Sequence, residues 1–212
     1  MVSRIGRLYR RYRDAVEPKV LPEVTIERSD EVVADRRVLV IGSGNLAKCV
    51  AESVRYSGSR VDHFDLSLSS SGYSVTYDGA VIVSKLTSIL ERRNGDKHIS
   101  SAATGELEKL YFANQFACKR LQRGCAIVNI VCSDSGCFWK EEIEGLTRGV
   151  AMAAADVGVS VNTIQLVSRT GEPDNSSTPV WDDLTSSVLF YLSKAGVMAT
   201  GNVARHVVDD AS

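Results

Sequence analysis

The sequence lacks any long apolar segment. No run among its 212 residues approaches the roughly 20 apolar residues that a membrane-spanning helix needs, and the first residues lack the apolar region of a secretory signal peptide. Cysteine is sparse, and the five cysteines are odd in number and match no zinc-binding spacing. We therefore expect no disulfide scaffold and no metal site, but reduced thiols in a cytoplasmic protein that is at most peripheral to a membrane.

The sequence also lacks an excess of either charge. Its 25 basic and 26 acidic side chains give a net charge of −1, which provides no global attraction for nucleic acid, so we expect no nucleic-acid partner. A hydrophobic content of 44% over 212 residues is enough for one well-buried α/β domain. The chain is too short for a separate substrate domain of ordinary size.

Residues 1–37 differ from the rest and form a predicted N-terminal extension before a domain at 38–212. Five arginines between positions 4 and 13 precede the first acidic residue, Asp14. Apolar residues recur among them at helical spacing, which predicts a short amphipathic helix before Pro18. Packing of this helix on its own domain or on a sister subunit is favoured over binding to a protein partner or a membrane surface.

From Val38 onward, short apolar runs alternate with helical stretches. The predicted strands are 38–41, 61–65, 80–83, 126–131, 160–166 and 204–208, and the predicted helices are 45–56, 104–122, 139–157 and 182–195. Strands that are apolar on both faces and separated by helices are typical of a parallel sheet covered on both sides. We therefore predict a three-layer α/β Rossmann fold with a doubly wound parallel sheet. Residues 168–179 form a predicted surface loop.

A glycine-rich turn follows the first predicted strand. Its sequence is Gly42-Ser43-Gly44-Asn45-Leu46-Ala47, a G-x-G-x-x-A pattern that leads into a helix. Gly42 permits the tight turn, Gly44 lets the backbone approach a pyrophosphate, and Ala47 allows close packing of helix on strand. The N–H groups of the helix N-terminus favour phosphate. The pattern predicts a dinucleotide site formed by these six residues.

Asp65 ends the next predicted strand, 23 residues after Gly42. A carboxylate at this position accepts a hydrogen bond from the ribose 2′-hydroxyl and repels a 2′-phosphate, so NAD is favoured over NADP as the cofactor. A tight structural turn at Gly42 and a solvated strand end at Asp65 are the alternatives. We favour the nucleotide site because strand, glycines, helix and acid occur together.

Several later segments resemble the short-chain dehydrogenase/reductase family. They are residues 126–132, 140–148 and 159–164, with 78–83 similar to the family's fourth strand and 200–203 similar to its C-terminal T-G-x-x motif. The resemblance extends from about Val38 to Asp209. It implies a Rossmann fold and hydride transfer between NAD and a carbonyl or alcohol carbon.

The resemblance also implies catalytic residues. The family uses Ser, Tyr, Lys and Asn, and here Lys140 matches the lysine, which also holds the nicotinamide ribose. Asn114 falls where a family helix carries its asparagine, and Cys132 stands near the position of the serine. The tyrosine position, four residues before Lys140, is Gly136. Glycine has no proton to give, so the general acid or base of the family is missing.

Two functions therefore stay open: an NAD-dependent oxidoreductase with a relocated proton donor, and a catalytically silent relative that serves as a nucleotide-binding or structural partner subunit. The residues considered as relocated donors are Cys132, Cys137, Tyr73, Tyr77, Tyr111, His63, His98 and His206. The tyrosines and histidines lie outside the matched positions. A ligase or transferase is disfavoured, because no second phosphate-binding motif is present.

The predicted helices 104–122 and 139–157 correspond to those that members of the family commonly pack across a dimer axis. The second helix carries Gly145, Gly149 and several alanines, which permit close approach of another helix. Packing of these small residues on the sheet alone is the alternative. We predict a homo-oligomer that forms through these two helices.

Overall fold

Six parallel strands form the central sheet of the computed structural model, in the order β2-β1-β3-β6-β7-β8. The structure describes residues 33–65, 75–86, 90–93, 96–99, 101–134, 140–168 and 178–208. The sheet strands are β1 (Arg37–Ile41), β2 (Arg60–Phe64), β3 (Gly79–Leu86), β6 (Ala126–Asp134), β7 (Ser160–Ser168) and β8 (Val203–Val208). The parallel sheet predicted from the apolar runs is confirmed.

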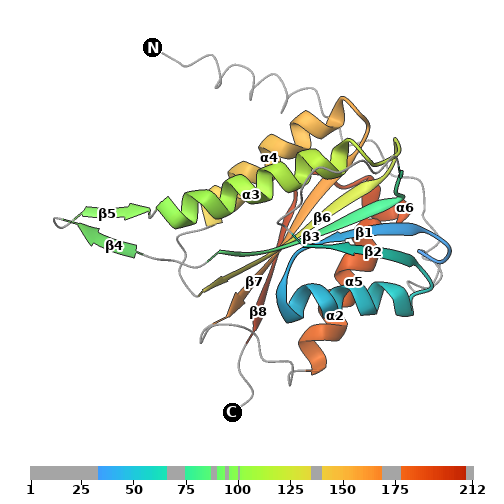
Figure 1. Cartoon of the computed structure of the whole chain (residues 1–212), viewed down its shortest axis with the longest axis horizontal. Helices are drawn as coiled ribbons and strands as arrows, with labels where there is room; N and C mark the ends of the chain where they lie inside the picture. The colour runs from blue at the N-terminus through green and yellow to red at the C-terminus, as the bar shows by residue number, and fades with distance from the viewer. Residues whose placement is uncertain are drawn as a thin grey trace.

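Helices cover both faces of this sheet (Figure 1). One face carries α2 (Gly44–Tyr56) and α5 (Thr178–Leu192), and the other carries α3 (Ser101–Cys118) and α4 (Lys140–Ala155). A short helix, α6 (Lys194–Val197), follows α5. The three-layer α/β architecture is therefore confirmed.

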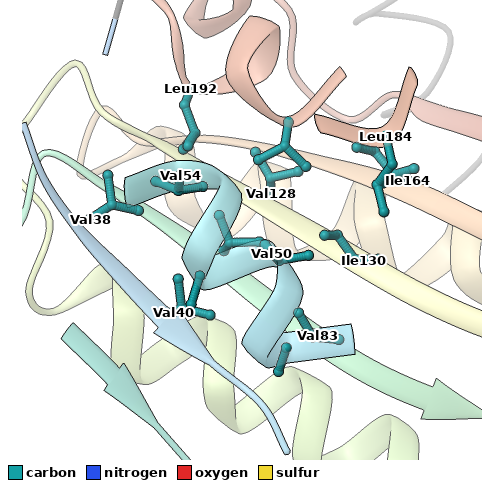
Figure 2. Close-up of a cluster of buried hydrophobic side chains, with 14 of the residues drawn as sticks. Val38, Val40, Val50, Val54, Val83, Val128, Ile130, Ile164, Leu184 and Leu192 are labelled. Atoms are coloured by element: carbon teal, nitrogen blue, oxygen red, sulfur yellow. The ribbon is translucent and has the colours of Figure 1, made fainter. Parts of the chain in front are cut away.

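Side chains along each strand point alternately to the two faces of the sheet, and this divides the core into two layers. In β6, Val128 and Ile130 pack with α2 and α5, whereas Ile127 and Val131 pack with α3 and α4. Figure 2 shows the first of these layers, where Val50 of α2 lies among the strand side chains. Each fully buried aliphatic side chain contributes about 1.5–3 kcal/mol, which explains why these strands are apolar on both faces.

The chain changes direction across the sheet between β1 and β3. From β1 it passes to β2 on one side, and it then crosses back so that β3, β6, β7 and β8 extend on the other side. In an open parallel sheet, ligands bind at the carboxyl ends of the strands at such a switch point. The carboxyl ends of β1 and β3 therefore locate the candidate site.

In the described part of the chain, β2 is an edge strand of the sheet. Arg37 of β1 forms an ion pair with Asp62 of β2, with 2.7 Å between Nη2 and Oδ2. The order 3-2-1-4-5-6 of many dinucleotide-binding folds has one more strand beyond this edge. Among the described residues, no strand lies beyond β2.

Two features differ from the prediction, and two others lie outside the described residues. An antiparallel hairpin of β4 (Leu90–Arg93) and β5 (Asp96–Ile99) precedes α3 and was not predicted. The helix predicted at 104–122 instead spans Ser101–Cys118. The predicted N-terminal helix and residues 169–177 of the predicted loop lie outside the described residues.

The packed unit includes residues before Val38. Val33 is completely buried within the α2/α5 layer, and the Nη1 of Arg36 donates a hydrogen bond of 2.7 Å to the carbonyl of Leu192. None of the described helices combines the length and apolar character needed to cross a bilayer.

Candidate functional site

The glycine turn lies at the switch point between β1 and β3. Gly42 has a φ of 156°, and a Cβ built on it would lie 2.8 Å from the carbonyl oxygen and 2.9 Å from the Cβ of Val83 in β3. The same Cβ would lie 3.2 Å from the Cβ of Ala47. No side chain fits at Gly42 without displacing β3, and only a small residue fits at Ala47.

The N-terminus of α2 is open at this turn. The N-cap residue Ser43 makes no side-chain hydrogen bond to the helix, and the first turn contains no acidic residue. Ser43, Gly44 and Asn45 are exposed. Gly44 has a φ of 83°, and the space where its Cβ would point is empty. The first N–H groups of α2 have no side-chain cap, and this arrangement fits a phosphate group.

The predicted cofactor residues thus occupy two environments. Ser43, Gly44 and Asn45 lie on the surface, whereas Ala47 is buried and Leu46 packs partly against the α2/α5 layer. The first group has backbone available to a ligand. The second fixes the helix against the sheet.

The end of β2 lies next to the glycine turn. The N–H of Gly42 donates to the carbonyl of Phe64 at 2.9 Å, and the exposed Asp65 is the next residue. His63 also contacts the turn, with 2.9 Å between its Nε2 and the carbonyl oxygen of Gly42. The structure therefore brings Asp65 and the glycine motif together, and it adds His63.

At the carboxyl end of β6, Cys132 and the helix that carries Lys140 lie on opposite faces of the sheet. Cys132 belongs to the buried layer under α2 and α5, whereas the alternation of the strand directs its neighbour Ser133 to the face of α3 and α4. Ser133 is 4% exposed. Lys140 is exposed and begins α4 at the carboxyl edge of the sheet. Ser133, rather than Cys132, thus shares a face of the sheet with α4.

A buried amide holds Ser133 in place. The Nε2 of Gln165 donates to the Oγ of Ser133 at 3.0 Å, and the Oε1 of Gln165 accepts from Nε and Nη2 of Arg205, both at 3.1 Å. Gln165 is 1% exposed. Because Ser133 accepts this bond, its own O–H stays available to donate to another group.

Asn114 lies in the core between α3 and β6. Its Nδ2 donates to the carbonyl of Leu110 at 2.8 Å and to the Oδ1 of Asn129 at 3.0 Å. Asn129 precedes Cys132 by three residues, which is about 10 Å along a strand. The structure therefore places the Asn114 side chain beside the middle of β6, away from the carboxyl end where Ser133 and Lys140 lie.

The contact between Asn114 and Asn129 continues across the sheet. The Nδ2 of Asn129 lies 3.5 Å from the Oγ1 of Thr163 in β7, and that hydroxyl lies 2.7 Å from the Oγ1 of Thr147 in α4. Thr147 in turn donates to the carbonyl of Ile143. This ladder joins α3, β6, β7 and α4, and it defines how both helices sit on the sheet.

The described tyrosines and histidines considered as relocated donors have other surroundings. Tyr77 precedes β3 at the amino edge of the sheet, where burial and a hydrogen bond to Asp62 raise the pKa of its hydroxyl. The hydroxyl of Tyr111 accepts from Gln115 on α3, and His206 lies 3.4 Å from Ser187 of α5. His98 belongs to the hairpin strand β5. Gly136, Cys137 and Tyr73 lie outside the described residues.

Two residues near the switch point were missed from the sequence, Ser133 and Lys85. Lys85 is exposed on β3, two residues after Val83, and therefore lies on the same face as the side chain that contacts the glycine turn. The sequence signal for Lys85 was a charged side chain close to the end of an apolar strand beside the switch point. No cluster of three or more metal-ligating side chains occurs among the described residues.

Comparison with known proteins identifies the fold. No model of a known protein family matches the sequence, and no curated protein does. A short-chain dehydrogenase from Leptospira borgpetersenii, solved with bound NAD+, matches with a TM-score of 0.59 and 17% identity over 91% of this chain and 98% of its own. A doubly substituted short-chain dehydrogenase/reductase from Serratia marcescens matches with a TM-score of 0.59 and 14% identity over 83% and 97% of the two chains.

BdcA from E. coli also matches, with a TM-score of 0.52 and 15% identity over 83% of this chain and 99% of its own. These neighbours show that the chain has the fold of the short-chain dehydrogenases/reductases. The fold that the sequence resemblance implied is confirmed.

The Gly42→Ala substitution tests the geometry of the turn. We expect it to lower the free energy of unfolding by at least about 2 kcal/mol, because the added methyl overlaps Val83 in a backbone conformation that side chains rarely adopt. Urea denaturation followed by circular dichroism measures the change. The control is Gly105→Ala in α3, where the space is open and alanine stabilises a helix by up to about 1 kcal/mol. Equal stabilities of the two variants would contradict the geometry.

Proposed function

We propose that the chain is an NAD(H)-binding protein of the short-chain dehydrogenase/reductase type and an oxidoreductase with an atypical active site. The observation that carries this proposal is the open N-terminus of α2, which follows Gly42 directly at the switch point between β1 and β3. Uncapped amides and a positive-φ glycine at a switch point of a parallel sheet are the arrangement that binds a dinucleotide pyrophosphate.

The residues that hold the cofactor in this proposal surround the turn. Gly42, Ser43, Gly44 and Asn45 present backbone to the pyrophosphate, with Leu46 and Ala47 anchoring the helix behind them. The exposed carboxylate of Asp65 accepts from the ribose 2′-hydroxyl and disfavours a 2′-phosphate, so NAD is the proposed cofactor. NAD supplies the hydride acceptor or donor when bound, and the NAD+ in the Leptospira neighbour supports this assignment by analogy of fold.

The substrate side of the proposed site combines Lys140 and Ser133. Lys140 begins α4 at the carboxyl edge and presents a cation there, while the Ser133 hydroxyl is oriented by Gln165 and donates to a carbonyl or alcohol oxygen. Asn114 acts at a distance in this proposal, through the ladder that positions α3 and α4. Because Gly136 holds no proton, we expect a rate about 10²–10⁴ below that of an enzyme with a positioned acid or base.

The second candidate is a silent relative that binds the dinucleotide and acts as a partner subunit. The surroundings of the described residues considered as relocated proton donors support the silent relative. Tyr77, Tyr111 and His206 contact other residues at a distance from Ser133. Dinucleotide binding without turnover is the property that distinguishes this candidate from an enzyme. Under both candidates we propose a cytoplasmic protein.

A self-association surface is also proposed on α3 and α4. These helices lie side by side on one face of the sheet (Figure 1), and their outer sides expose Phe112 by 61% and Met152 by 67%. Gly145 and Gly149 leave open space beside Met152, as required for close approach of a second helix. The proposed partner is a second copy of this chain.

The Gly44→Ala substitution tests the cofactor site. We expect it to weaken NADH binding at least about tenfold, because the methyl occupies the open space in front of the helix N-terminus. Fluorescence titration with NADH measures the affinity. Gly124→Ala is a matched control, since Gly124 has a similar φ of 85° and open surroundings in the turn before β6, at the opposite edge of the sheet. Equal losses in both variants would show that backbone strain, not the site, causes the effect.

A pair of substitutions on β6 tests the substrate side. In the enzyme, Ser133→Ala should lower turnover about tenfold or more with little change in NADH affinity, because a hydrogen bond to the substrate oxygen is lost. Cys132→Ala should have a smaller effect on turnover, because that side chain faces α2 and α5. NADH oxidation with a panel of aldehydes and ketones provides the assay. Wild-type binding without any turnover would favour the silent subunit.

The double substitution of Phe112 and Met152 by Glu tests self-association. We expect it to convert an oligomer to a monomer, because two charges would be buried in the interface. Light scattering coupled to size exclusion gives the mass. Tyr56→Glu, at a position 95% exposed at the end of α2 on the opposite layer, should leave the mass unchanged. A monomeric wild-type protein would overturn this surface.

A further inference from the structure

A line of polar side chains joins the edge strand β8 to the carboxyl end of β6. Arg205 of β8 pairs in register with Gln165 of β7, and Gln165 reaches Ser133 of β6 at 3.0 Å. Val203 of β8 packs against the core under α3 and α4, and Arg205, two residues later, lies on the same face of the sheet. All three polar side chains therefore meet on the side of α3 and α4.

Arg205 determines which way the amide of Gln165 points. A carboxamide has an acceptor oxygen and a donor nitrogen of similar size, so its two orientations have nearly the same shape. A guanidinium has donors only, and Nε and Nη2 of Arg205 both lie 3.1 Å from the Oε1 of Gln165. The opposite orientation would place donors against a donor. The oxygen of the amide therefore faces Arg205, and its nitrogen faces Ser133.

This orientation in turn directs the hydroxyl of Ser133. The Oγ accepts from the Nε2 of Gln165, so the hydroxyl hydrogen points away from the amide. Within the described part of the chain, the Ser133 side chain makes no other hydrogen bond. Gln165 and Ser133 are 1% and 4% exposed, so the direction of their bond is determined by the protein rather than by solvent. The hydroxyl is left as a donor at the carboxyl end of β6.

We propose that Gln165 and Arg205 are positioning residues of the substrate site, which together hold the Ser133 hydroxyl as a hydrogen-bond donor. A donor selects a substrate group that accepts, such as a carbonyl oxygen, over an ammonium group, which has no acceptor. This inference rests on the proposed function, in which the substrate oxygen lies beside Ser133. The edge strand β8 then influences the site through one buried amide.

The Gln165→Glu substitution reverses the hydrogen bond and keeps the shape of the side chain. A carboxylate only accepts, and the guanidinium of Arg205 beside it favours the ionised form. The Ser133 hydroxyl then donates to the new carboxylate and no longer to the substrate. We expect kcat/KM for NADH-dependent reduction of aldehydes and ketones to fall about tenfold or more, with little change in NADH affinity. Gln115→Glu on the exposed side of α3 is the matched control and should keep wild-type turnover.

Combination with Ser133→Ala separates a positioning role from a general loss of structure. Once the hydroxyl is absent, Gln165→Glu should cause no further loss of turnover, because the two residues act as one unit. Losses that multiply in the double variant would overturn the proposal, as would wild-type turnover in Gln165→Glu alone. Urea denaturation followed by circular dichroism establishes that each variant is folded.

NMR of the full chain tests the role of Arg205 without turnover. Ser133→Ala should shift the side-chain amide signals of Gln165, which are assigned by their absence from Gln165→Glu. In an Arg205→Met background this shift should fall to about half or less, because the amide then adopts both orientations. An undiminished shift would overturn the role of Arg205. A wild-type protein that turns over no aldehyde or ketone would instead overturn the oxidoreductase function on which the inference rests.

Discussion

The close approach of Gly42 to Val83 is the constraint on which the site depends. Strand β3 passes so near that a side chain at Gly42 has no room, and α2 begins two residues later with Ala47 packed into the same corner. The chain must therefore turn sharply where β1 ends, which brings the helix amides to the switch point. The backbone bond from Gly42 to Phe64 then sets the end of β2, with Asp65, beside them.

The two halves of the site depend on different kinds of geometry. The half that is proposed to bind the cofactor is formed mainly by backbone, and its form follows from where glycine is required. The half that is proposed to bind the substrate depends on which way single side chains point. Along β6, the neighbouring residues Cys132 and Ser133 lie on opposite faces of the sheet. The ladder from Asn114 to Thr147 sets the helices on the Ser133 side. A sequence resemblance to the family therefore predicts the geometry of the first half better than that of the second.

The strands and glycine turn could be predicted from the sequence because buried parallel strands are continuous apolar runs, and the Gly42 motif has a defined backbone requirement. The face of the sheet on which Cys132 lies could not be predicted, because a strand that is buried on both faces shows no alternation of polar and apolar residues. The hairpin β4–β5 was missed because residues 91–98 are almost entirely polar or charged. Asn114 matched a family position in sequence, but its helix places it against the middle of β6.

The edge position of β2 among the described strands has a consequence for the behaviour of the protein in concentrated solution. With β2 at the edge in the described part of the chain, its outer backbone groups are a template that another chain's strand can extend. The exposed Arg60 and the Arg37–Asp62 pair place charge along this strand. Charged side chains on an edge strand oppose such extension. The ion pair, which lies at the amino end of β1, thus adds charge that opposes edge-to-edge pairing at β2, in addition to joining β1 to β2.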